Sequence, residues 1–210
     1  MPATVVDTPV GPARVHLLGD GPAGLLLLGH GAGGGVDTPD LAAAAAAALA
    51  LGWRVGLVEQ PYRVRGRRVA EAAPRLDAAW RAVCAELAVD GAGPLVTGGR
   101  SSGARVACRT ATAVGARAVL CLAFPLVPPG RPGVTRAGEL AAPTVPRLVV
   151  QGDRDPFGMP SEGAGVTVHR VAGADHAFRV RQRDGSRDGP RDVEAVLEGA
   201  VGRWLAQVLT

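Results

Sequence analysis

Lysine is missing from the sequence, and aromatic residues are scarce. All 23 basic side chains are arginine, and only 3% of the 210 residues are Phe, Trp or Tyr. A nucleic-acid-binding surface usually combines a basic stripe with aromatic rings on which bases stack. The modest net charge of +4 and the shortage of rings therefore argue against nucleic acid as a partner.

The chain also has few cysteines and no long hydrophobic run. Cys84, Cys108 and Cys121 are isolated and lie in apolar segments, which predicts buried free thiols rather than disulfides or a metal site. The apolar run at 41–51 is mostly alanine and too short to span a bilayer. No charged-then-apolar leader precedes the first expected strand. We therefore expect a cytoplasmic protein with no membrane partner.

Apolar runs of strand length alternate with helical patterns along the chain. Two short runs around a turn at 9–12 predict an N-terminal antiparallel hairpin. Further strands are expected at 24–28, 53–58, 94–97, 118–124, 147–151 and 166–171, and helices at 39–51, 74–89, 104–114 and 191–209. This alternation predicts a single α/β domain over residues 1–210, with a mostly parallel central sheet and helices on both faces.

Gly99, Ser101 and Gly103 form a G-x-S-x-G pattern between an expected strand and an expected helix. This pattern in this context is the nucleophile elbow of α/β-hydrolases. A serine at such a turn has a strained backbone, and the flanking glycines avoid clashes with neighbouring chain. The pattern alone also fits an ordinary connection, because the chain contains 30 glycines.

Candidate partners for Ser101 follow the later strands. The α/β-hydrolase order is Ser, then Asp or Glu, then His, and loops after parallel strands meet at one edge of the sheet. Asp153 and Asp155 follow the strand at 147–151, and His176 follows the last strand. Asp155 lies further out and is favoured as the acid, whereas Asp153 has the position of a turn former.

The glycine-rich loop after the strand at 24–28 suggests a site for developing negative charge. Acyl transfer needs two preorganised backbone N–H groups around the carbonyl oxygen. We expect these donors from Ala32 in the loop and from Ser102, the residue after the nucleophile. His30 is expected to position the loop through hydrogen bonds, and Gly31 to let its backbone approach the substrate.

The same loop supports an alternative hypothesis. Gly29, Gly31 and Gly34 match G-x-G-x-x-G, and Glu59 ends the next strand, as in a dinucleotide-binding fingerprint. The expected helix begins only after Thr38, so no helix N-terminus faces a pyrophosphate within the loop. This hypothesis also leaves the serine, aspartate and histidine motifs unexplained.

Several motifs together carry a resemblance to a known family: His30-Gly31-Ala32-Gly33-Gly34, Gly99-Arg100-Ser101-Ser102-Gly103, Phe124-Pro125-Leu126-x-Pro128-Pro129-Gly130, Gln151-Gly152-x-x-Asp155-Pro156-Phe157-Gly158 and Gly173-Ala174-Asp175-His176. In combination they resemble the small cap-less α/β-hydrolases. The most similar group is the dienelactone-hydrolase-like branch, which includes testis-expressed and NSL-complex hydrolase-like proteins. The resemblance implies Ser101 as nucleophile, Asp155 as acid and His176 as base, with no cofactor. Ser102 replaces the glycine or methionine often found after the nucleophile, and the connection at 125–146 is too short for a helical lid.

These observations predict a serine hydrolase that acts on a small-molecule carboxylic ester or thioester through an acyl-enzyme. The alternative is a non-catalytic interaction module on the same fold, because some members of the branch serve as scaffolds. An arginine-rich loop at 63–68 is interpreted as a solvated surface, with attraction of an anionic substrate as the other possibility. Arg100 is expected to anchor a neighbouring loop.

Overall fold

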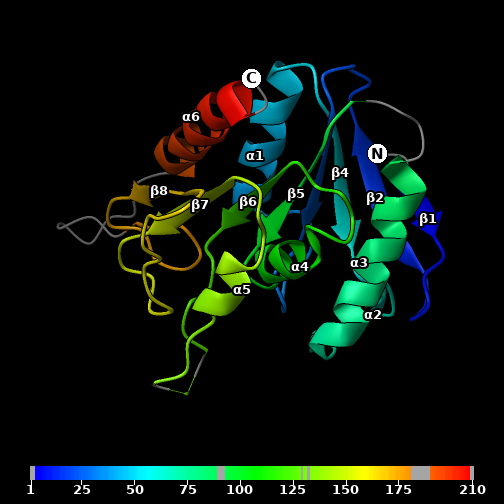
Figure 1. Ribbon diagram of the computed structural model, residues 1–210, viewed down its shortest axis with the longest axis horizontal. Coiled ribbons are helices and arrows are strands. Elements are labelled where there is room, and N and C mark those ends of the chain that lie inside the picture. The colour runs from blue at the N-terminus through cyan, green and yellow to red at the C-terminus, as the bar shows by residue number, and fades with distance from the viewer. Residues whose placement is uncertain (1–2, 89–92, 129, 132, 181–189, 209–210) are drawn as a thin grey trace.

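An eight-stranded sheet runs through the centre of the molecule in the order β1-β2-β4-β3-β5-β6-β7-β8 (Figure 1). This computed structural model describes residues 3–88, 93–128, 130–131, 133–180 and 190–208. The strands are β1 (Ala3–Val6), β2 (Ala13–Leu18), β3 (Leu25–Gly29), β4 (Arg54–Glu59), β5 (Leu95–Arg100), β6 (Ala118–Leu122), β7 (Arg147–Gly152) and β8 (Val166–Val171). Strand β2 pairs antiparallel with β1 and β4, and all remaining pairs are parallel. The predicted α/β sheet with its N-terminal hairpin is confirmed.

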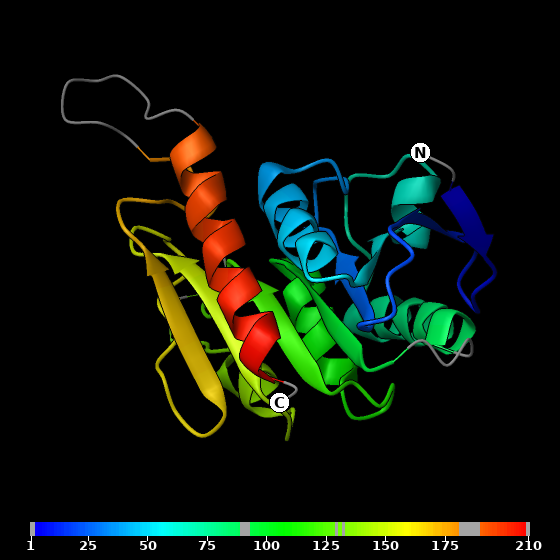
Figure 2. The same ribbon diagram turned by 90° about the horizontal axis from the view of Figure 1, so that it is seen from above.

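Helices cover both faces of the sheet. Helices α1 (Pro39–Ala50) and α6 (Pro190–Val208) lie on one side, and α3 (Ala73–Ala88) and α4 (Ser102–Thr110) lie on the other (Figure 2). Side chains alternate across a strand, so in β3 Leu26 and Leu28 join the core under α1 and α6, while Leu25 and Leu27 pack with Trp80 of α3. This two-sided burial explains why β3 is an unbroken apolar run.

Two short helices occupy segments for which the sequence predicts only irregular structure. Helix α2 (Pro61–Val64) lies within the expected loop after β4, and it begins with a proline, which suits the first helical position. Helix α5 (Ala137–Ala141) interrupts the connection between β6 and β7. With only this five-residue helix in that connection, the described residues form no helical lid.

The structure also corrects one helix end. Helix α4 stops at Thr110 rather than near residue 114, because the chain continues as turns in which the Ala116 N–H donates to the Ala111 carbonyl at 3.0 Å. Thr38 occupies the N-cap of α1, but its hydroxyl makes no capping hydrogen bond. The expected ends of α3 at 89 and α6 at 209, and the arginine-rich loop before α6, lie outside the described residues.

The three cysteines are buried and free, as predicted. Burial raises the pKa of Cys84 to about 12. Cys108 of α4 and Cys121 of β6 lie with their sulfur atoms 3.5 Å apart. Buried thiols of this kind behave as small apolar core groups. In the described part of the chain, no helix is both long enough and apolar enough to cross a bilayer.

Candidate active site

Ser101 lies at the sharp turn between β5 and α4. Its backbone φ of 51° and ψ of −106° belong to a conformation that non-glycine residues rarely adopt. A Cβ atom on Gly99 or Gly103 would overlap the backbone of Gly29 in β3. The Ser101 N–H also donates to the Leu122 carbonyl at 2.9 Å. Glycine on both sides therefore lets the strained turn sit directly against the neighbouring strand.

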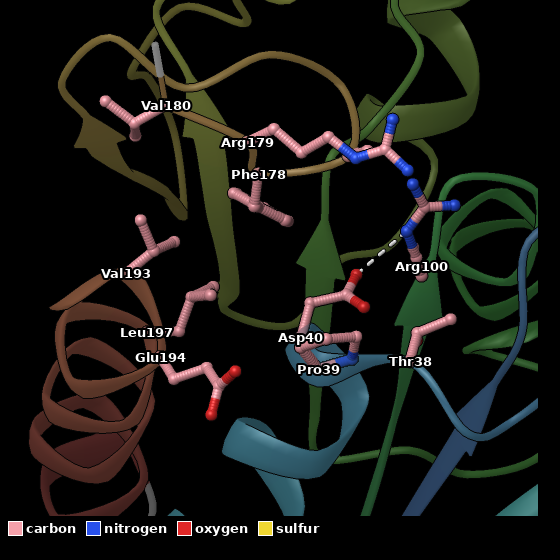
Figure 3. A pocket seen from close by; sticks show the side chains of 11 residues that line it. Thr38, Pro39, Asp40, Arg100, Phe178, Arg179, Val180, Val193, Glu194 and Leu197 are labelled. Carbon is pink, nitrogen blue, oxygen red and sulfur yellow. Dashed lines mark ion pairs between the residues drawn. The ribbon is translucent and has the colours of Figure 1, made fainter. Parts of the chain in front are cut away.

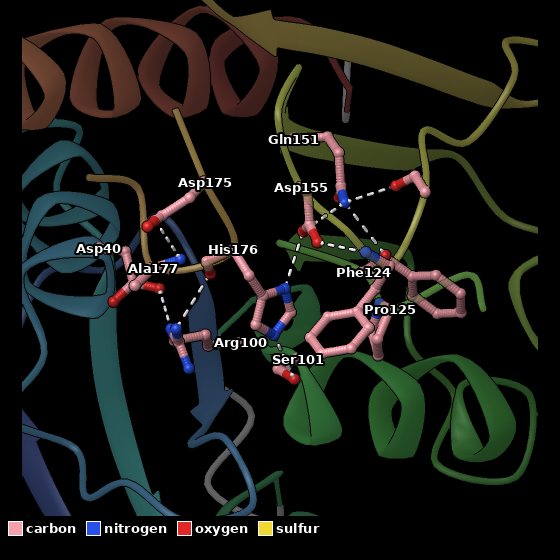
Figure 4. A network of polar contacts seen from close by, with 12 residues as sticks. Asp40, Arg100, Ser101, Phe124, Pro125, Gln151, Asp155, Asp175, His176 and Ala177 are labelled. Atoms are coloured by element: carbon pink, nitrogen blue, oxygen red, sulfur yellow. Dashed lines mark hydrogen bonds and ion pairs between the residues drawn. The ribbon is translucent and has the colours of Figure 1, made fainter. Parts of the chain in front are cut away.

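The side chains of Ser101, His176 and Asp155 form a continuous hydrogen-bonded chain (Figure 4). Nε2 of His176 lies 3.0 Å from the Ser101 hydroxyl, and its Nδ1 lies 2.7 Å from Oδ2 of Asp155. With a carboxylate as acceptor, Nδ1 carries the proton, so Nε2 accepts the hydrogen bond of the serine hydroxyl. Asp155 has a fully buried side chain, whereas that of His176 is 20% exposed. This geometry matches a serine, a general base and an orienting carboxylate.

Asp153 and Asp155, the two carboxylates considered as partners of His176, make different contacts. Asp155 contacts the imidazole, while Asp153 accepts a hydrogen bond from the Gly173 N–H at 2.7 Å in an exposed turn. The second oxygen of Asp155 accepts the Phe157 N–H at 2.8 Å. The Phe157 ring stands perpendicular to the His176 ring, with 4.5 Å between their centroids. The loop after β7 thus holds both the carboxylate and one side of the imidazole.

Gln151, near the end of β7, holds Asp155 from the side away from Ser101 (Figure 4). Its fully buried side chain donates through Nε2 to Oδ2 of Asp155 at 2.8 Å, to the Gly158 carbonyl at 2.9 Å and to the Phe124 carbonyl at 3.3 Å. All three neighbours are acceptors, so the amide nitrogen must face them. The sequence pattern included Gln151 but did not mark it as a positioning residue.

His30 is buried behind the glycine-rich loop. Its Nδ1 lies 2.7 Å from the Gly31 carbonyl, and its Nε2 accepts the Gln60 N–H at 3.1 Å. Since the backbone N–H can only donate, Nε2 is unprotonated and Nδ1–H donates to Gly31. Burial lowers the pKa of His30, despite the hydrogen bond to Gly31. A neutral imidazole therefore ties the loop to the end of β4.

Tyr62 on α2 holds the next residue of the loop. Its hydroxyl donates to the Ala32 carbonyl at 2.7 Å, and burial raises the pKa of Tyr62 to about 12, which keeps the donor protonated. Within the described residues, the Ala32 N–H donates to no acceptor. Ser102 begins α4, where an N–H lacks an acceptor within the helix. No motif in the sequence singled out Tyr62.

Arg100 joins three segments around the site. Its Nε lies 2.9 Å from Oδ2 of buried Asp40 in the first turn of α1, and its Nη2 donates to the His176 carbonyl at 3.0 Å. Arg100 thus anchors the loop that carries His176, as the sequence predicts for Arg100 and a neighbouring loop. This ion pair borders a cavity of about 410 Å³ between α1, α6 and residues 177–180, which Ser101 does not line (Figure 3).

A different cavity, also of about 410 Å³, contains Ser101 and Ser102. Its other walls come from the glycine-rich loop, α3, α4 and the segments around α5 and Phe157; the lining residues are Ala32, Ala70, Glu71, Ala73, Leu76, Arg105, Arg109, Pro125, Arg136 and Phe157. A volume of this size suits a small organic ligand. Ser101 therefore lines a space that is large enough for a small molecule.

The glycine-rich loop does not have the geometry of a dinucleotide site. Helix α1 begins at Pro39, beyond Gly34, so its N-terminus does not open within the loop. A Cβ atom on Gly31 would lie 2.8 Å from Nη1 of Arg100 and 3.7 Å from Cβ of Ser101. Gly31 thus lies against Arg100 and Ser101 at the turn after β5.

Together, the sheet order, the strained serine turn and the lidless connection define an α/β-hydrolase fold. A family model described as an alpha/beta hydrolase domain matches residues 22–199, and the chain belongs to this family. No curated protein matches the sequence.

Solved structures share the fold at low sequence identity. An α/β serine hydrolase without a lid, XC6422 from Xanthomonas campestris, is 23% identical, with 97% of this chain and 94% of that chain covered and a TM-score of 0.71. Est1E from Butyrivibrio proteoclasticus is 16% identical, with both chains fully covered (100%) and a TM-score of 0.75. A dienelactone hydrolase from Anabaena variabilis is 17% identical, with 99% and 97% covered and a TM-score of 0.72.

Proposed function

We propose that the protein hydrolyses a carboxylic ester or thioester of a small molecule, with Ser101 as nucleophile. The observation that carries this proposal is the hydrogen-bonded chain from the Ser101 hydroxyl through His176 to buried Asp155. The three side chains come from the loops after β5, β7 and β8. An arrangement of these groups activates a hydroxyl that is otherwise a weak nucleophile.

The reaction proceeds through an acyl-enzyme. Oγ of Ser101 forms a bond to the carbonyl carbon while Nε2 of His176 takes the hydroxyl proton, and Asp155 stabilises the resulting imidazolium. The carbonyl oxygen becomes negative and accepts hydrogen bonds from the N–H groups of Ala32 and Ser102. The C–O or C–S bond to the leaving group then breaks, and the leaving group receives the proton from His176. Water, deprotonated by His176, attacks the acyl group and restores the serine.

The backbone donors carry a substantial part of the rate. Loss of one such donor in a related site typically costs about 3 kcal/mol of transition-state stabilisation. The Ala32 N–H has no acceptor in the described structure. The His30 imidazole holds the Gly31 carbonyl, which belongs to the same peptide group as this N–H, and the Tyr62 hydroxyl holds the carbonyl of the next peptide group. This supports a preorganised oxyanion site, which needs no metal or organic cofactor.

The choice of an ester or thioester also draws on the structural neighbours. One neighbour is named a dienelactone hydrolase and another is the esterase domain of a Rhodothermus marinus protein, at 16% identity and a TM-score of 0.67. Both names denote ester cleavage. The cavity at Ser101, of about 410 Å³, is large enough for a small-molecule ester.

A fluorophosphonate activity probe tests the proposal. The wild-type protein should be labelled at Ser101, and Ser101→Ala should lose both labelling and the hydrolysis of p-nitrophenyl esters and of acyl thioesters, by about 10⁴-fold or more. Ser161→Ala removes an exposed serine elsewhere and serves as the matched control. A folded wild-type protein that neither reacts with the probe nor hydrolyses any ester or thioester refutes the proposal and leaves the interaction-module alternative.

A further inference from the structure

The cavity at Ser101 has a basic wall. Arg105 and Arg109 on α4 and Arg136 just before α5 line it together with the nucleophile. All three residues are partly exposed. A cavity that binds a hydrocarbon acyl chain would have an apolar wall, whereas this wall carries charged side chains. The net charge of the wall therefore determines which substrates the cavity favours.

Two of these arginines are neutralised by carboxylates. Arg105 makes two hydrogen bonds of 2.7 Å to Glu139 on α5. Arg109 holds Asp77 on α3 at 2.6 and 2.9 Å and also reaches Glu139 at 3.1 Å. Burial on its own would raise the pKa of Glu139, but the hydrogen bonds and charges of the two arginines hold it below its ordinary value. These groups form a closed network that fixes α3, α4 and α5 together.

The carboxylate that lines the cavity itself, Glu71, is also paired. Glu71 lies 2.7 Å from Nη2 of Arg65 and 3.0 Å from Nε of Arg75. Among the described residues, none of these three carboxylates forms an ion pair with Arg136, the third arginine of the wall. The groups of the two networks and the wall comprise five guanidiniums against three carboxylates: Arg65, Arg75, Arg105, Arg109 and Arg136 against Glu71, Asp77 and Glu139.

Arg136 is the wall arginine with no ion-pair partner among the described residues. Its one side-chain hydrogen bond runs from Nη1 to the Pro125 carbonyl at 3.1 Å, which fixes the direction of the guanidinium. Burial lowers the pKa of Arg136, and the charges of neighbouring arginines lower it further, while the charge of Glu139 opposes this in part. Arginine nevertheless stays protonated near neutral pH. Arg136 thus presents an oriented cation with free N–H groups in the cavity of the nucleophile.

Resting on the proposed function, we propose that the substrate is an ester or thioester that carries an anionic oxygen group, such as a carboxylate, and that Arg136 binds this group while Ser101 attacks the carbonyl. A guanidinium binds carboxylates through parallel N–H donors. A wholly apolar substrate would displace water from Arg136 without replacing its hydrogen bonds, which is unfavourable. Ala70, Ala73 and Leu76 line the same cavity and suit a short hydrocarbon spacer between the two groups.

Pairs of substrates that differ only in the anionic group test this assignment. Two pairs are needed, because the anionic group can lie on either side of the scissile bond. One arm compares the p-nitrophenyl ester of adipic acid with that of its methyl-capped form. The other arm compares the acetate ester of 4-hydroxybenzoate with that of methyl 4-hydroxybenzoate. The wild-type protein should favour the anionic member of one arm by about tenfold or more in kcat/KM, as expected for one partly exposed charged hydrogen bond.

Variants connect this preference to Arg136. Arg136→Gln should abolish the preference, mainly through KM, while hydrolysis of the neutral ester is retained. Arg136→Lys should keep part of the preference, because lysine keeps the positive charge but lacks the two parallel N–H donors of the guanidinium. Arg117→Gln removes an exposed arginine that precedes β6, at the opposite edge of the sheet, and should keep the full preference. Thermal melting of each variant establishes that it is folded.

The outcomes separate the two proposals. Failure of the probe to label Ser101 refutes the hydrolase and the anionic subsite together. Normal labelling and hydrolysis of the neutral esters, with no anionic preference in either arm, refutes the subsite alone. An anionic preference that survives unchanged in folded Arg136→Gln assigns the recognition to another group and also overturns the proposal.

Discussion

Replacing Gln151 by methionine tests whether the buried Gln151 amide holds the Asp155 carboxylate in place. Methionine has nearly the shape of glutamine but no donor, so it keeps the volume at a position that is fully buried. The change removes the hydrogen bonds from Nε2 to Asp155, Gly158 and Phe124. Asp155 then retains only the Phe157 N–H and the His176 imidazole.

The expected loss of stability follows from these contacts. A hydrogen bond to a charged group contributes about 1.5–3 kcal/mol, and a bond between neutral groups about 1 kcal/mol. Three acceptors share the two protons of the Gln151 amide, so the contacts together contribute about 3–5 kcal/mol. Methionine also removes Oε1 of Gln151, which has no partner among the described residues. The free energy of unfolding should therefore fall by about 2–4 kcal/mol.

The same change should lower activity in the folded protein. A carboxylate free to shift lets the imidazole shift, and a displacement of about 1 Å at a reacting group costs on the order of 100-fold in rate. We expect kcat for a p-nitrophenyl ester to fall by about 10- to 100-fold, measured where urea denaturation shows the variant to be folded.

Thr97→Val is the matched control for this experiment. Thr97 is also fully buried, but its hydroxyl makes no hydrogen bond to any described residue. Its removal should leave the free energy of unfolding unchanged or raise it, and kcat should stay the same. If Gln151→Met behaves like Thr97→Val in both measurements, the amide does not position Asp155 and the reasoning is wrong.

Two further substitutions test the packing of the nucleophile turn and the arginine network. Gly103→Ala places a Cβ against the Gly29 carbonyl and should lower the free energy of unfolding by about 1–3 kcal/mol. The control Gly138→Ala places its Cβ in open space on α5 and should not lower it. Equal midpoints of urea denaturation for the two variants would contradict this prediction. The folded pKa of Glu139 is lowered, so its stabilisation is complete above its ordinary value of 4.5 and is lost as pH falls below it. Glu139→Gln should flatten the decline of Tm between about pH 5 and 3, and an unchanged decline would exclude this role.

Much of this protein follows from local sequence pattern. Unbroken apolar runs such as 25–28 predicted strands buried on both faces, and alternation with helical segments predicted their parallel order. G-x-S-x-G marked the serine turn, because a turn pressed against β3 admits only glycine at positions 99 and 103. The position of His176 directly after the last strand predicted that it lies at the same edge of the sheet as Ser101, because the carboxyl ends of parallel strands meet at one edge.

Other features depend on contacts between segments that are distant in the chain. Asp153 and Asp155 differ little in sequence, and only the path of the loop after β7 directs Asp155 toward His176. Tyr62 reaches Ala32 because a short helix follows β4, for which no periodicity is visible. Which arginine remains unpaired depends on where α3, α4 and α5 place their carboxylates. Local periodicity encodes where helices and strands form, whereas side-chain pairing is decided by packing, and so only the tertiary structure could show it.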